Sequence, residues 1–137
     1  MKSPVFLLPY AGTLPFVCAA LSRVISLSAF ITAAEITHII LLYSLAILSF
    51  MAGVHWGQYV AGRRSTIKLL ISSNVITLAG WFGSFYLSPQ SAELLFIALF
   101  ALLYLIDGGL GLDTAYLQMR RNVTLIVCAS LLVICFA

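Results

Sequence analysis

The sequence predicts an all-α integral membrane protein, a single domain over residues 1–137 built as a bundle of about five transmembrane helices. Hydrophobic residues make up 63% of the 137 residues and charged residues only 8%. Soluble domains usually carry about 25% charged residues. A surface this poor in charge cannot face water, so lipid must cover most of it. The apolar residues also form runs of about 20 residues, the length at which a helix crosses a bilayer.

The expected helices are separated by residues typical of helix ends. Thr32 and Glu35 have the spacing of a capping box, and Pro89 suits the first turn of a helix. Pro9 and Pro15 lie in the first apolar run, and no small-residue cleavage site leads into a polar domain, so we interpret this run as a retained helix. The expected spans are about Val5–Ser22, Ala33–Tyr59, Ile67–Leu87, Pro89–Leu112 and Ala115 to the C-terminus, with a short interfacial helix over Arg23–Ile31.

The orientation is predicted from lysine and arginine, which stay on the cytoplasmic side during insertion. With the N-terminus inside, six of the seven basic residues are cytoplasmic and only Arg23 is outside. The cytoplasmic set is Lys2, Arg63, Arg64, Lys68, Arg120 and Arg121. We therefore expect a multi-pass protein of the cell inner membrane, with a cytoplasmic N-terminus and a periplasmic C-terminus.

Polar residues at membrane depth gather near the cytoplasmic ends of four helices. They form a candidate intramembrane polar network of His55, Asp107, Asn74, Tyr10 and Gln58. A carboxylate in a bilayer costs at least a few kcal/mol unless it is paired or neutral, and His55 is the natural partner of Asp107. Such a pair could relay protons or donate a hydrogen bond to a quinone carbonyl. Alternatively, the pair only holds the second helix against the fourth, and we favour this structural interpretation.

Small residues recur every four positions along the second helix, at Ser49, Gly53, Gly57 and Ala61. Small side chains let membrane helices approach closely, so Gly53 and Gly57 are candidate helix-packing residues. We expect this ridge to pack inside the monomer rather than to form a homodimer seam. The remaining ionisable residues at depth, Glu35, His38 and Glu93, are expected at outer helix ends, where water or helix N-termini satisfy them.

The sequence offers no complete catalytic, cofactor or metal signature. His38 and His55 are about 25 Å apart along one helix, too far to hold one metal ion. The three cysteines form no CxxC pair, and the glycines near residue 109 lack the strand and the lysine of a phosphate loop. The net charge of +3 comes from basic residues at the ends of apolar runs, which does not indicate nucleic-acid binding. We expect a protein that is not an enzyme and has no cofactor.

Several segments resemble a known family. They are Tyr10-Ala11-Gly12-Thr13-Leu14-Pro15-Phe16, Ile47 to Gly57 with its Gly-x-His-Trp-Gly core, Ser73 to Trp81, Asp107, and Tyr116 to Thr124. Together they are similar to the bacterial proteins called domain of unknown function 3429, which include the mitochondrial transmembrane protein 69. The resemblance spans nearly the whole chain and implies a small multi-helix membrane protein, with a respiratory membrane suggested by analogy.

Two function classes follow from these observations, ahead of a third, a quinone- or lipid-handling enzyme. We expect a non-enzymatic accessory subunit or assembly factor of a larger membrane complex, with a respiratory complex as one setting, whose partners are the lipid bilayer and other membrane subunits. The alternative is a small oligomeric channel, transporter or proton-handling protein that works through the His55–Asp107 pair.

Overall fold

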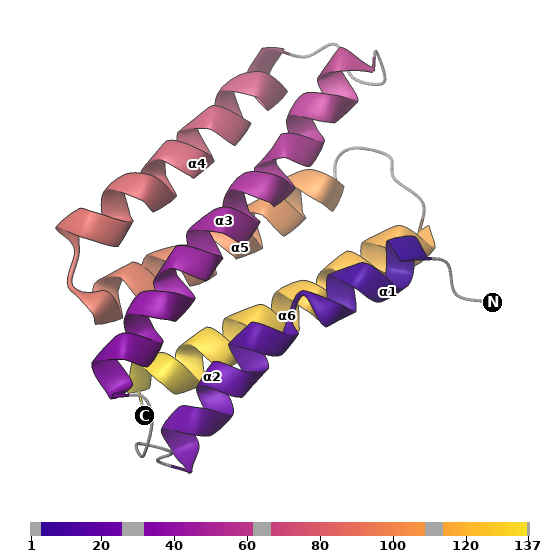
Figure 1. The fold of residues 1–137 in the computed structure, drawn as a ribbon. Helices are drawn as coiled ribbons and strands as arrows, with labels where there is room; N and C mark the ends of the chain where they lie inside the picture. The colour runs from indigo at the N-terminus through magenta and orange to yellow at the C-terminus, as the bar shows by residue number, and fades with distance from the viewer. Residues whose placement is uncertain (1–3, 26–31, 62–66, 109–113, 137) are drawn as a thin grey trace.

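The chain folds into α-helices, as the sequence predicts (Figure 1). The computed structural model describes residues 4–25, 32–61, 67–108 and 114–136, and these form six α-helices and no strand. The helices are α1 (Pro4–Ala11), α2 (Leu14–Val24), α3 (Ala33–Val60), α4 (Ile67–Tyr86), α5 (Pro89–Gly108) and α6 (Thr114–Phe136). Three of them, α3, α5 and α6, are long and apolar enough to cross a membrane by length and composition.

The helices pack as a closed ring. In order around the ring, α2 packs on α6, α6 on α5, α5 on α4, α4 on α3 and α3 back on α2. A further contact between α3 and α5 crosses the ring, and α1 lies along α6 (Figure 1). The core between them is apolar, and its largest fully buried side chains include Phe16, Phe96, Phe100, Leu48 and Leu103. This arrangement brings α3, α5 and α6 together, and they supply the candidate site.

The predicted first helix is broken into α1 and α2 at Gly12 and Thr13. Pro15 explains the break, because a proline inside a helix lacks the N–H that would bond four residues back and its ring clashes with that carbonyl. The interrupted backbone is satisfied locally. The Thr13 hydroxyl donates to the Tyr10 carbonyl at 2.6 Å, and the Tyr43 hydroxyl of α3 donates to the Gly12 carbonyl at 2.8 Å. The broken segment is therefore tied to α3.

The other predicted helices match the structure to within a few residues. Thr32 caps α3 by accepting a hydrogen bond from the backbone N–H of Glu35 at 3.1 Å, as the capping-box spacing predicts. Pro89 is the first residue of α5. Of the proposed interfacial helix over Arg23–Ile31, residues 26–31 lie outside the described part of the chain, and Arg23 and Val24 belong to α2.

Close packing of α4 on its neighbours depends on Gly80. A Cβ atom at Gly80 of α4 would lie 2.7 Å from Leu48 Cδ2 and 3.2 Å from Phe96 Cε1, so only glycine lets α4 approach both α3 and α5 there. In contrast, a Cβ atom at Gly53 or Gly57 would meet nothing within 4 Å among the described residues, and both are exposed. The prediction that these two glycines pack inside the monomer is wrong, because the ridge lies on the face of α3 that points away from the core.

Candidate functional site

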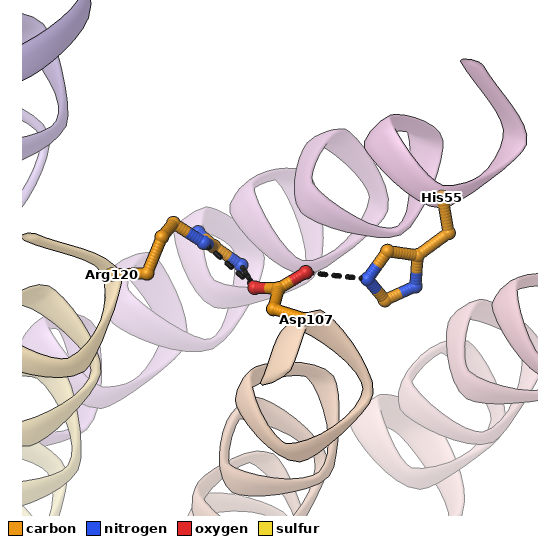
Figure 2. Close-up of polar contacts among 3 residues, drawn as sticks. All are labelled: His55, Asp107 and Arg120. Carbon is orange, nitrogen blue, oxygen red and sulfur yellow. Dashed lines mark hydrogen bonds and ion pairs between the residues drawn. The ribbon is translucent and has the colours of Figure 1, made fainter. Parts of the chain in front are cut away.

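Three buried ionisable side chains from three helices meet at one end of the bundle (Figure 2). His55 Nε2 of α3 lies 2.7 Å from Asp107 Oδ1 of α5. Arg120 of α6 donates from Nε to Asp107 Oδ2 at 2.8 Å, and its Nη2 lies 2.6 Å from the same oxygen. The relative exposures of the three residues are 0%, 1% and 5%. We call His55, Asp107 and Arg120 the polar triad.

Each member reaches the triad from the core-facing stripe of its helix. His55 continues the buried stripe of Ser44, Leu48 and Met51 on α3, with steps of three or four residues. Asp107 lies four residues after buried Leu103 on α5. Arg120 lies three residues before buried Val123, whereas the adjacent Arg121 is exposed. Helical periodicity therefore selects one of the two neighbouring arginines for the interior.

The buried carboxylate of Asp107 has a partner on each of its two oxygens. A lone ion in a low-dielectric environment is unstable, and a paired one is tolerated when hydrogen bonds satisfy its remaining acceptors. Arg120 supplies the opposite charge on Oδ2, and the His55 ring supplies a hydrogen-bond partner on Oδ1. The second ring nitrogen, Nδ1, is buried and has no hydrogen-bond partner among the described residues. Chemically, the triad can lock three helices together, and it holds an imidazole against a carboxylate.

The structure brings together one predicted pair and leaves two of the other three predicted members, Asn74 and Tyr10, apart from it. His55 and Asp107 make contact, as their depth suggests. Asn74 is exposed and donates to the Leu70 carbonyl of its own helix at 3.1 Å, so its expected place in the network is wrong. Tyr10 is also outside the triad, since its hydroxyl accepts a hydrogen bond from Asn122 at 3.1 Å. The side chain of Gln58 lies outside the described part of the chain.

Arg120 is the member that sequence reasoning missed. The positive-inside rule alone explains Arg120 as a cytoplasmic basic residue, so the sequence gives no separate need for a buried role. A signal was present in the stripe of Val123, Val127 and Ile134, all buried in the structure, because extending this stripe back by one turn reaches Arg120. The need of Asp107 for a cation pointed the same way.

The opposite end of the bundle holds a second buried carboxyl group. Glu93, at the second turn of α5, is 2% exposed, and its Oε2 has no hydrogen-bond partner among the described residues. Of the two expected ways to satisfy Glu93, access to water is therefore wrong, because α5 packs this face into the core. The other, the N-terminus of a helix, stays a prediction. At the same end, polar and apolar residues line a second cavity, and there Arg23 of α2 donates to the Thr37 hydroxyl of α3 at 3.1 Å. Glu35 and His38 are exposed, as expected.

Comparison with known families identifies the family of this chain. The model of the family described as "Protein of unknown function (DUF3429)" matches residues 1–136, and the chain belongs to this family. No curated protein and no solved structure matches the chain. The predicted family is thereby confirmed, and the resemblance to transmembrane protein 69 stays an expectation.

Proposed function

We propose that this DUF3429 member is a non-enzymatic accessory subunit or assembly factor of a larger complex in the inner membrane. The description of the family names no activity, so the proposal rests on the structure of this chain. The observation that carries the proposal is the exposed face of α3 around Gly53 and Gly57. Small residues there repeat every four positions on a helix long enough to cross a membrane. Such a face allows a second helix to approach the backbone closely, and this is how membrane helices commonly associate.

The neighbouring exposed side chains support the same proposal. Phe50 is 76% exposed and Val60 is 70% exposed, one on each side of the two glycines along α3. Large residues that flank a shallow glycine groove provide the knobs that fill the gaps between two packed helices. We call the surface of Ala46, Phe50, Gly53, Gly57 and Val60 the α3 face. A partner helix placed on it would leave the core of the monomer unchanged.

The test is affinity purification of the tagged protein from native membranes in mild detergent, followed by mass spectrometry and crosslinking. A photoreactive amino acid in place of Phe50 should crosslink to one membrane protein that also copurifies in fixed stoichiometry. Gly53→Leu should abolish both signals, while Gly108→Leu should preserve them, because a Cβ atom at Gly108 also meets nothing within 4 Å among the described residues. Recovery of the chain alone, or crosslinking only to itself, would contradict the accessory role.

The second candidate is a small oligomeric channel, transporter or proton-handling protein. The contact of His55 with Asp107 at 2.7 Å favours it, because imidazole and carboxylate groups at membrane depth are the usual parts of proton relays. Against it, Arg120 occupies the other carboxylate oxygen, and the triad already has a structural role. Purified protein in liposomes separates the two candidates. Proton or solute flux that His55→Gln abolishes in a folded protein would favour this second function.

A further inference from the structure

A cavity of about 430 Å³ lies beside the polar triad, between α1, α2, α3, α5 and α6. Its volume falls in the range of about 300–1,000 Å³ that small-molecule sites occupy. The lining is almost wholly apolar and partly aromatic, with Phe16, Met51, Val54, Phe100 and Val127 among its residues. Arg120 also lines it, so one member of the triad forms part of its wall.

The cavity follows the bundle axis away from the triad. On α3 its lining runs from Val54 back to Ile47, which corresponds to about 10 Å of helical rise. On the opposite side it is lined by Gly12 and Thr13, where α1 and α2 are interrupted. Irregular backbone at membrane depth is tolerated where it is buried in protein or lines a cavity. The helix break therefore belongs to the wall of this cavity.

Thr124 gives the cavity an unused hydrogen-bonding group. The residue lines the cavity and is 7% exposed, and its buried hydroxyl has no partner among the described residues. Hydroxyl groups in helices usually bond a carbonyl three or four residues back. The hydroxyls of Ser49, Ser73, Thr77 and Ser84 do so in the described helices. The Thr124 hydroxyl is therefore an unpartnered donor in the wall of a mostly apolar cavity, and rotation about the Thr124 Cα–Cβ bond would turn it toward a ligand there.

The charges near the cavity favour a neutral ligand. Arg120 is one turn before Thr124, but its positive charge is compensated by Asp107 through two contacts with Oδ2. An anionic head group would add a charge without a counterion in a low-dielectric site, which is unfavourable. A neutral carbonyl oxygen needs one donor, which Thr124 can provide.

We propose that this cavity binds an uncharged, lipid-soluble amphiphile, with its apolar chain along α3 and α6 and its carbonyl oxygen accepting a hydrogen bond from the Thr124 hydroxyl. The cavity shares Phe50 with the α3 face, but Gly53 and Gly57 do not line it. The proposal rests on the cavity and on Thr124, so it does not depend on the accessory role. It gives the interrupted first helix and the unpartnered hydroxyl one common explanation.

The test compares three compounds of similar chain length on the purified full-length protein in detergent. These are 2-tridecanone, dodecanoate and tridecane, with binding followed by native mass spectrometry and thermal shift. We expect one 2-tridecanone per chain. Its affinity should exceed that of tridecane by about two- to tenfold, the contribution of one neutral hydrogen bond. Dodecanoate should bind more weakly than the ketone. Equal affinity for ketone and alkane, or tightest binding of dodecanoate, would overturn the proposal.

Two variants locate the site. Thr124→Val removes the hydroxyl with little change of shape, so it should abolish the preference for the ketone while the affinity for tridecane stays the same. Val54→Trp should fill the cavity and reduce binding of both compounds at least tenfold. Val75→Trp is the matched control, because Val75 of α4 is 57% exposed and does not line the cavity. An unchanged ketone preference in Thr124→Val would refute the proposal even if Val54→Trp failed to fold.

Discussion

Arg120 and Asp107 are thirteen residues apart in the chain and form a buried ion pair across the α5–α6 hairpin, with an Nη2–Oδ2 distance of 2.6 Å. Removing one partner of such a pair leaves an uncompensated charge inside the bundle. We predict that Asp107→Asn lowers the free energy of unfolding in mild detergent by about 3–5 kcal/mol. Asp107→Asn combined with Arg120→Gln should be less destabilised than the sum of the two single variants, with a coupling of about 0.5–3 kcal/mol. Strict additivity would show that the pair does not stabilise the fold.

A smaller loss is expected at the other carboxylate oxygen. His55→Leu removes the partner of Oδ1 but leaves the ion pair on Oδ2 intact. The free energy of unfolding should fall by about 1–3 kcal/mol, the cost of one buried acceptor left without a donor. His38→Leu on the same helix is the control, because His38 is exposed. Equal effects of the two substitutions would argue against a specific role of the triad in stability.

Substitution by leucine should have different effects on stability at Gly80 and at Gly53. Gly80→Leu forces a side chain into Leu48 and Phe96 and should destabilise the fold by about 1–3 kcal/mol or more. Gly53→Leu should leave the unfolding temperature of the isolated monomer nearly unchanged, since it meets nothing within 4 Å among the described residues. Thermal unfolding of both variants, purified as monomers, decides the matter. A folding defect in Gly53→Leu would restore the intramolecular role that the sequence suggested.

The hydrogen bond from Tyr43 to the Gly12 carbonyl should hold the interrupted first helix against α3. Tyr43→Phe leaves that carbonyl without this donor and should cost about 1–3 kcal/mol. Amide hydrogen exchange at residues 10–16 should accelerate at the same time. Tyr86→Phe serves as the control, because Tyr86 is 74% exposed. Exchange that stays unchanged in Tyr43→Phe would mean that the helix break is stable without this contact.

The orientation in the membrane is open to a direct test. The distribution of lysine and arginine predicts a periplasmic C-terminus and a cytoplasmic connection between α3 and α4. A phosphatase fused after Ala137 should therefore be active, and one fused after Arg64 should be inactive. A fluorescent reporter that matures only in the cytoplasm should give the opposite pattern. Reversal of both patterns would place Arg23 on the cytoplasmic side.

The helices were predictable from the sequence because membrane spans are specified by length and hydrophobicity. The depth of a residue along its helix also follows from counting, which is why the contact of His55 with Asp107 could be foreseen. Which side of a helix faces the core cannot be found by counting residues. Asn74 has a suitable depth, but it is exposed and bonds the Leu70 carbonyl of its own helix. The order of helices in the ring, which determines rotation, depends on packing between distant segments.

The small-residue ridge of α3 is a second case in which the sequence does not identify the neighbour of a helix face. A repeat every four residues establishes that Ser49, Gly53 and Gly57 share a face, but it does not say which neighbour that face meets. The contacts of Gly80 depend on Leu48 and Phe96, which come from two other helices. The break at Gly12 had a local cause in Pro15, and this part was accessible from sequence alone.

The ion pair also bears on how the chain enters the membrane. The ribosome makes α3 before α5, so His55 reaches the bilayer before Asp107 exists. The two charged members then arrive on successive helices of one hairpin, close enough in sequence to neutralise each other as they leave the translocon. A paired carboxylate and guanidinium cost far less to insert than either ion alone. Biogenesis would thus proceed with the last two helices as a single, electrically balanced unit, and a chain cut between them would present an unpaired acid to lipid, a feature that membrane quality control could recognise.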